Sequence, residues 1–189
     1  MQVPAVTTHL IWSVTGVLAA IDLAFAAVLS LRLRAPWSPR LPPVLLTVGT
    51  LSFAALFTWA FRSYWDSCYA AALPAAMKSL APLLGAVLGA LGWMFWWLAR
   101  RPGRGAVPLF LLLGALESVP GHLNAIYRFD LLERCPLIQG ISPASALVFG
   151  IFEFGFYWSV VLTASNVVAR LLDGGTTRSR RTREPPVSG

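Results

Sequence analysis

Residues 144–169 read ASALVFGIFEFGFYWSVVLTASNVVA, and this stretch decides which class of fold the chain can adopt. It contains a single carboxylate, Glu153, in a run longer than the ~20 residues that a helix needs to cross a ~30 Å hydrocarbon layer. The alternation typical of barrel strands is missing, and a helix satisfies its own backbone in lipid. We therefore predict a membrane-spanning helix here.

Four further apolar stretches precede this one, at residues 10–31, 44–61, 80–99 and 106–127. The whole chain is 57% hydrophobic and only 12% charged, whereas about a quarter of the residues in a soluble domain are charged. The sequence predicts an all-α integral membrane bundle of five transmembrane helices in one domain, residues 1–172. Residues 173–189 are polar and rich in arginine, which predicts a disordered basic tail.

The cations are unevenly divided between the two ends of the predicted helices. Eleven flank one end: Arg32, Arg34, Arg40, Arg100, Arg101, Arg104, Arg170, Arg178, Arg180, Arg181 and Arg183. Four flank the other: Arg62, Lys78, Arg128 and Arg134. The positive-inside rule therefore predicts an outer amino terminus and a cytoplasmic carboxy terminus.

The same distribution accounts for the net charge of +7. Because the cations flank apolar segments, the lipid bilayer is the expected partner and nucleic acid is not. Basic residues are almost all arginine, and small residues are mostly alanine and glycine, as in GC-rich genomes. We expect a multi-pass protein of the cytoplasmic membrane of a bacterium with such a genome.

Both cysteines, Cys68 and Cys135, fall in loops on the predicted outer side. In an oxidising compartment they are expected to form a disulfide bond between the two loops. The alternative is two unrelated thiols. The chain contains no C-x-x-C motif, which argues against a thiol oxidoreductase.

Three carboxylates, Asp22, Glu117 and Glu153, lie near the middle of predicted spans. At ~1.5 Å per helical residue, each is roughly 13 to 18 Å from the outer end of its helix. Ionisable groups at such depth usually face the interior of a bundle and mark a site or a pathway. The three acids are therefore the main functional clue in the sequence.

Small and polar residues share a helical face with each acid. These stripes contain Thr15, Ala19, Asp22, Ala26 and Ser30; Gly114, Glu117, Gly121, Asn124 and Arg128; and Gly150, Glu153 and Tyr157. Pro120 is expected to bend its helix beside Glu117 and His122. The candidate catalytic residues are Glu117 and Glu153 as acid and base, with His122 assisting. The candidate ligand-binding residues are Asp22, Asn124 and Tyr157.

The chain lacks the motifs of several common chemistries. Neither His9 nor His122 belongs to a metal-binding pair, and there is no G-x-S-x-G elbow or glycine-rich phosphate loop. We expect no metal and no other cofactor.

Three classes of function stay open. The first is a small polytopic protein whose polar cluster binds a hydrophobic, lipid-like ligand or supports helix packing and partner binding. The second is an enzyme with carboxylate acid/base chemistry on a lipid-like substrate. The third is a proton- or cation-coupled transporter. This class is less favoured, because many transporters move through inverted repeats and the five predicted helices contain none.

Glycines recur in the third predicted span at Gly85, Gly89 and Gly92. Small residues at this spacing let two helices approach closely. We expect close packing within the chain, with a homo-oligomer formed through Gly85 and Gly89 as the alternative.

Overall fold

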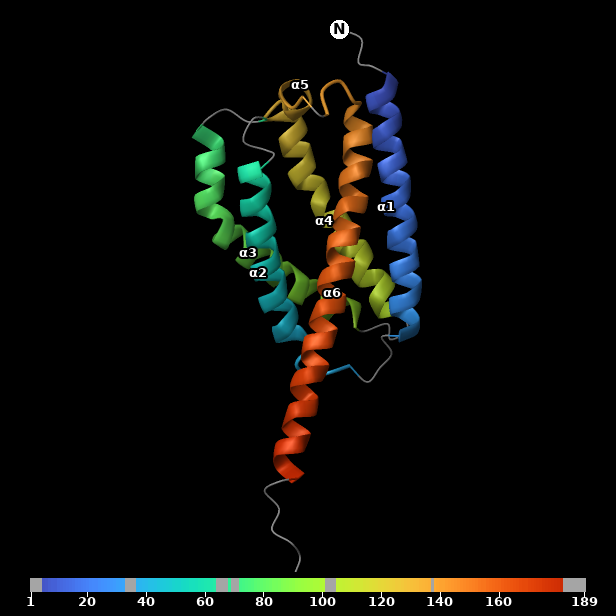
Figure 1. Ribbon diagram of the computed structural model, residues 1–189, viewed down its shortest axis with the longest axis vertical. Coiled ribbons are helices and arrows are strands. Elements are labelled where there is room, and N and C mark those ends of the chain that lie inside the picture. Colours follow the sequence, from blue (N-terminus) through green and yellow to red (C-terminus); the bar gives the residue numbers. More distant parts are fainter. Residues whose placement is uncertain are drawn as a thin grey trace, which may run out of the picture.

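Figure 1 shows a computed structural model of the chain, which describes residues 5–32, 37–63, 68, 72–100, 105–136 and 138–181. Every regular element in these ranges is a helix, and five are long and apolar enough to span a membrane. These five are α1 (Ala5–Arg32), α2 (Leu41–Ser63), α3 (Ala72–Ala99), α4 (Ala106–Tyr127) and α6 (Pro143–Arg181). The prediction of an all-helical bundle with five candidate spans is confirmed.

Successive long helices run in opposite directions, so their ends gather at two poles (Figure 1). The short helix α5 (Leu131–Arg134) lies at the pole where α1 and α6 begin. We call this pole the disulfide end, because Cys68 and Cys135 meet there. The opposite pole, where α6 ends, is the tail end.

Helix α6 holds the bundle together, because α1, α2 and α4 all pack against it. Helix α3 packs along α2 and also reaches α4. The largest fully buried side chains, Trp96, Phe110 and Trp158, come from α3, α4 and α6. Large apolar side chains such as Leu23, Leu51 and Leu171 are exposed on the outside, as expected of a surface that faces lipid.

Glycines set the distance between α2 and α3. A Cβ atom added to Gly49 would lie 3.2 Å from the Cα atom of Gly89, so the two backbones touch. A Cβ atom at Gly89 would collide with the Leu46 carbonyl oxygen, and one at Gly85 with the Thr50 carbonyl oxygen. Packing within the chain therefore accounts for both glycines, and self-association through them stays a prediction.

The Trp158 indole is seated between two further glycines. A Cβ atom at Gly92 would lie 2.6 Å from Cζ3 of the indole, and one at Gly114 would collide with the pyrrole ring. Phe95 and Phe110 meet the indole edge-on, with ring centroids 5.9 and 5.7 Å away. Trp158 is fully buried and connects α6 to α3 and α4 at once.

Four of the long helices, α1, α2, α3 and α6, begin earlier than the sequence predicts. Helix α2 starts at Leu41 rather than residue 44, because Pro42 and Pro43 occupy its first turn, where a missing N–H group breaks no helical hydrogen bond. Helix α3 starts at Ala72 rather than residue 80 and contains Pro82.

Helix α6 also extends beyond the predicted span, into the residues for which the sequence predicts a disordered tail. Helix α6 continues to Arg181, and the remaining tail, residues 182–189, lies outside the described residues. Helix elongation is cooperative, and no proline occurs between Pro143 and Pro185 to stop it. At ~1.5 Å per residue, the helix is about 58 Å long, well beyond the ~30 Å of a hydrocarbon layer. Figure 1 shows its last turns projecting past the other helices.

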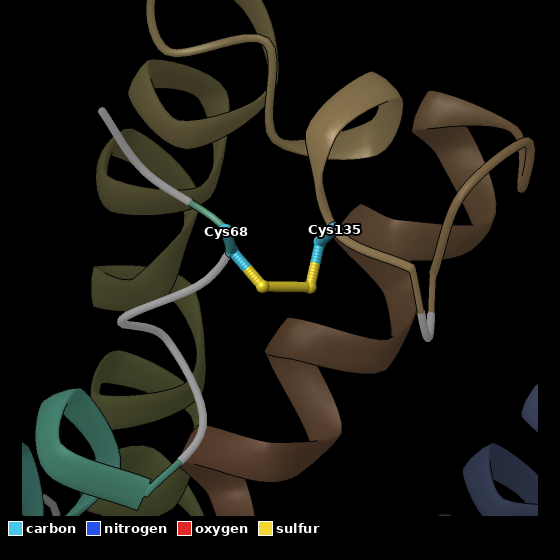
Figure 2. The surroundings of a disulfide bond; sticks show 2 residues. All are labelled: Cys68 and Cys135. Carbon is cyan, nitrogen blue, oxygen red and sulfur yellow. A yellow bond between two sulfur atoms is a disulfide. The ribbon is translucent and has the colours of Figure 1, made fainter. Parts of the chain in front are cut away.

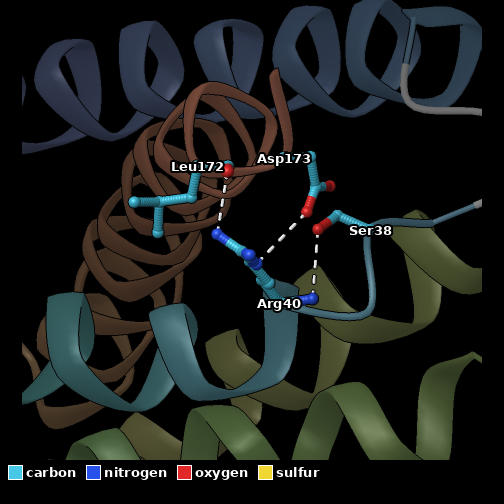
Figure 3. Close-up of polar contacts among 4 residues, drawn as sticks. All are labelled: Ser38, Arg40, Leu172 and Asp173. Carbon is cyan, nitrogen blue, oxygen red and sulfur yellow. Dashed lines mark hydrogen bonds and ion pairs between the residues drawn. The ribbon is translucent and has the colours of Figure 1, made fainter. Parts of the chain in front are cut away.

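Arg40 fixes α6 to the connection between α1 and α2 (Figure 3). Its Nη1 atom donates a hydrogen bond of 2.8 Å to the Leu172 carbonyl oxygen, and its Nε atom lies 3.4 Å from the Asp173 carboxylate. Its backbone N–H group donates to the Ser38 hydroxyl at 3.1 Å. This contact holds α6 at the point where the helix leaves the bundle.

A disulfide bond between Cys68 and Cys135 ties the connection between α2 and α3 to the segment after α5 (Figure 2). The two Cα atoms are 4.3 Å apart, and both residues are buried beside Leu131. The predicted pairing of the two cysteines is therefore present in the structure. It links the α2–α3 pair to α4 and α6 at the disulfide end.

We predict that Gly89→Ala lowers the free energy of unfolding by about 1 to 3 kcal/mol, because α3 must move away from the Leu46 carbonyl group. The measurement is an SDS-unfolding titration in micelles. Gly16→Ala is the control, since a Cβ atom there meets nothing within 4 Å and should stabilise α1 slightly. Equal effects of the two substitutions would contradict the close packing of α2 and α3.

Candidate functional site

Glu153 lies inside the candidate span Pro143–Gly174, about 15 Å along the helix from its first residue. Its side chain is 50% exposed on the surface of the bundle. The helical repeat places Gly150, Phe154 and Tyr157 close to the same side of α6. A carboxylate at this depth, partly open to the surroundings, is the feature around which the other polar groups gather.

His122 on α4 is the ionic partner of Glu153. Its Nε2 atom lies 3.9 Å from the Glu153 Oε2 atom, and its Nδ1 atom lies 3.0 Å from the Ser118 carbonyl oxygen. Gly150 makes room for this ring, because a Cβ atom there would collide with the imidazole. Gly150 thus has a specific role, because the lack of a side chain there allows His122 of α4 to approach Glu153.

The Ser118 contact determines how protons are distributed in the pair. A carbonyl oxygen only accepts hydrogen bonds, so His122 Nδ1 carries a hydrogen. The Nε2 atom then faces the Glu153 carboxylate, 3.9 Å from its Oε2 atom. His122 and Glu153 together can hold one proton in two ways, as imidazolium with carboxylate or as imidazole with carboxylic acid.

Glu117 and Tyr157 join α4 and α2 to the same side of α6. The Glu117 carboxylate accepts a long hydrogen bond, 3.5 Å, from the indole N–H group of Trp158, whose ring centroid lies 5.2 Å from that of Tyr157. That hydroxyl donates to the Gly49 carbonyl oxygen at 3.2 Å and lies 3.1 Å from the Ser52 hydroxyl. Glu117 and Tyr157 are therefore held by hydrogen bonds to neighbouring helices.

Aromatic rings continue the site from α6 to α2. The Phe53 ring lies 6.5 Å from the Phe154 ring and 6.0 Å from the Tyr157 ring, measured between centroids. The Phe154 ring meets the His122 imidazole edge-on at 5.9 Å. We call this set the polar site; it consists of Phe53, Glu117, His122, Glu153, Phe154 and Tyr157. All of its side chains are at least partly exposed.

Asp22 lies away from the polar site. It packs from α1 against Gly155, where a Cβ atom would approach its carboxylate and also the Ala115 side chain. Two residues along a helix are a rotation of about 200°, so Gly155 lies on the other side of α6 from Glu153. The Asp22 Oδ1 atom is buried and has no hydrogen-bond partner among the described residues.

Asn124 has an exposed side chain on α4, nearer the disulfide end. Its backbone carbonyl accepts from Arg128 and Phe129 where the helix ends. The structure thus brings together four of the predicted site residues, Glu117, His122, Glu153 and Tyr157. It places Asp22 on a different face and Asn124 on the exposed surface of α4.

Sequence reasoning missed the contributions of Phe53, Phe154 and Trp158. The signal was present in the run FEFGFYW at residues 152–158, where aromatic side chains surround a carboxylate. A search of the described residues finds no group of three or more histidines, cysteines or acids arranged to hold a metal ion.

The chain matches no protein-family model, no curated protein and no solved structure. The class of the protein is therefore defined by its own architecture. It is a helical bundle of five helices that can span a membrane, with an acidic and aromatic site formed by α2, α4 and α6.

We predict that Glu117→Leu lowers the free energy of unfolding by about 1 kcal/mol relative to Glu117→Gln. Leucine leaves the buried indole N–H group of Trp158 without an acceptor, whereas the glutamine amide oxygen can replace the carboxylate. SDS unfolding of the two variants in parallel measures the difference. If the two variants have the same free energy of unfolding, the Glu117–Trp158 hydrogen bond does not contribute to stability.

Proposed function

We propose that this chain is a multi-pass membrane protein that binds a hydrophobic, lipid-like ligand at the polar site. The observation that carries the proposal is the half-exposed Glu153 carboxylate, which lies 3.9 Å from His122 and about 15 Å inside a candidate span. Hydrocarbon tails offer such a group no hydrogen bonds, and acids inside membranes usually face protein or a binding site. A ligand that covers Glu153 would complete its interactions.

A purely structural cluster accounts less well for this arrangement. Tyr157 shows what a structural polar group looks like in this fold, because its hydroxyl is bonded to two groups of α2. Glu153 has one partner at 3.9 Å and is open on its other side. Asn124 is also exposed and could contact a ligand nearer the disulfide end, while Asp22 is left outside this site.

A membrane-embedded enzyme is the second candidate, and the proximity of His122 to Glu153, with Nε2 and Oε2 3.9 Å apart, favours it. A group that can give and accept a proton within one site meets the first requirement of acid/base catalysis. In this case the lipid-like ligand would be a substrate, with His122, Glu153 and Glu117 as the reacting side chains. Turnover of the bound molecule distinguishes the enzyme from a binding protein.

We also propose that the disulfide end faces the outside and the tail end the cytoplasm, in a bacterial cytoplasmic membrane. Two independent features support this orientation. Arg40, Arg100 and Arg170 lie at the tail end, as the positive-inside rule requires of a cytoplasmic face. The Cys68–Cys135 bond lies at the opposite pole, and disulfide bonds persist in oxidising compartments.

We predict that a hydrophobic diazirine probe labels Phe53 and Phe154 in a saturable manner. The purified chain is reconstituted in lipid nanodiscs, irradiated with increasing probe and mapped by mass spectrometry. Trp59 is the internal control, because it is exposed on the outside of α2 and should be labelled in proportion to probe concentration. Labelling of all three residues without saturation would contradict a ligand site.

Orientation can be tested separately with fusions at the two ends. A green fluorescent protein fused after Gly189 should fluoresce, and alkaline phosphatase fused there should be inactive, because the former folds in the cytoplasm and the latter only outside it. Fusions in the connection that contains Ser38 should behave in the same way, and fusions after Pro136 should give the opposite result. The reverse pattern would overturn the proposed orientation.

A further inference from the structure

We infer that the ligand of the polar site is a lipophilic amine, a molecule with an apolar body and one basic nitrogen. This inference rests on the proposed function and specifies the chemical class that the same site recognises. Three observations carry it: the two carboxylates of the site, its aromatic faces and the approach of His122 to Glu153.

The polar site is acidic. It contains two carboxylates, Glu117 and Glu153, against one imidazole, and no described lysine or arginine pairs with either acid. An anionic ligand such as a fatty acid would add a third acidic group to this site. An amine that takes up a proton there would instead be a cation facing a carboxylate, and would form a charge-assisted hydrogen bond with Glu153.

Aromatic rings line the same place. Phe53, Phe154 and Tyr157 lie within 6.5 Å of one another, and all three are only partly buried. Aromatic faces attract an ammonium group through their quadrupole, and the attraction grows where water is excluded. Carboxylates surrounded by aromatic rings form a combination that suits a cation with hydrocarbon substituents better than an alcohol or an acid.

The aromatic rings also offer a path for the apolar body of the ligand. Phe57 stacks on Phe53 with a centroid distance of 5.4 Å, which extends the apolar surface along α2. Because the site lies at membrane depth, the rest of the ligand can remain among the lipid tails.

The His122–Glu153 pair explains how a charged form can be bound at this depth. The amine enters from the lipid as the neutral base. The pair then gives up its proton: the Nε2–H bond of the imidazolium or the O–H bond of the carboxylic acid breaks, and an N–H bond forms on the amine. The product is an ammonium ion facing a carboxylate, so no charge has to cross hydrocarbon on its own.

The test is competition against the saturable diazirine labelling of Phe53 and Phe154 in nanodiscs. Three probes with the same chain are compared at equal concentrations in the bilayer: N,N-dimethyldodecylamine, dodecanol and dodecanoic acid. We expect the amine to compete at a concentration about tenfold or more below that of the alcohol, and the acid to be weakest.

Two variants locate the preference in the site. Glu153→Gln should abolish the advantage of the amine over the alcohol, and Phe53→Leu should reduce it several-fold without changing the charge. Glu133→Gln on α5 is the matched control, because Glu133 is exposed and lies outside the spans. If Glu153→Gln does not fold, the ranking of the three probes in the unaltered chain and the Phe53→Leu result still show whether the site prefers an amine.

The outcomes separate the two proposals. Dodecanol equal to the amine, or dodecanoic acid better than it, would overturn the amine inference and leave a hydrophobic ligand in place. An amine advantage that survives in Glu153→Gln would also overturn it. Absence of saturable labelling in the unaltered chain would refute the proposed function itself.

Discussion

The bundle depends on how one side chain, the indole ring of Trp158, packs between neighbouring helices. Trp158 brings a large, flat side chain from the central helix α6 into a space that exists only because Gly92 and Gly114 have no side chains. Its rings then pack against Phe95 and Phe110, so one residue connects α6 to both α3 and α4. Packing of this kind matters in a membrane, where lipid tails are as apolar as the protein and hydrophobic burial contributes little to helix association.

The polar site follows from that packing. With Trp158 seated, its N–H group faces Glu117, and the neighbouring residues of α6 are presented toward α2 and α4. Glycine again provides the space, since Gly150 admits the His122 ring that pairs with Glu153. The large aromatic residues set the position of the helices, the glycines set how closely they approach, and the acids lie where three helices meet. The positions of the acidic and basic side chains at this site therefore depend on how the aromatic residues and glycines pack the three helices together.

The sequence was sufficient for features that depend on one helix at a time. Length and apolar character predicted the five spans, and the assignment of loops to one side predicted that Cys68 would meet Cys135. Features that depend on two helices at once were less accessible. Periodicity places Asp22 and Glu153 on polar faces of their own helices, but only the packing of α1 against Gly155 shows that these faces are separate. The apolar stretch ends at residue 169, so hydrophobicity alone did not predict the continuation of α6 to Arg181.

The Cys68–Cys135 bond also has a consequence for biogenesis. The two cysteines are separated by 67 positions, and α3 and α4 lie between them. In a chain that enters a membrane helix by helix, the two cysteines cannot meet until α3 and α4 are in place and α5 has been made. The bond therefore secures helices that have already been placed rather than guiding the first steps of assembly.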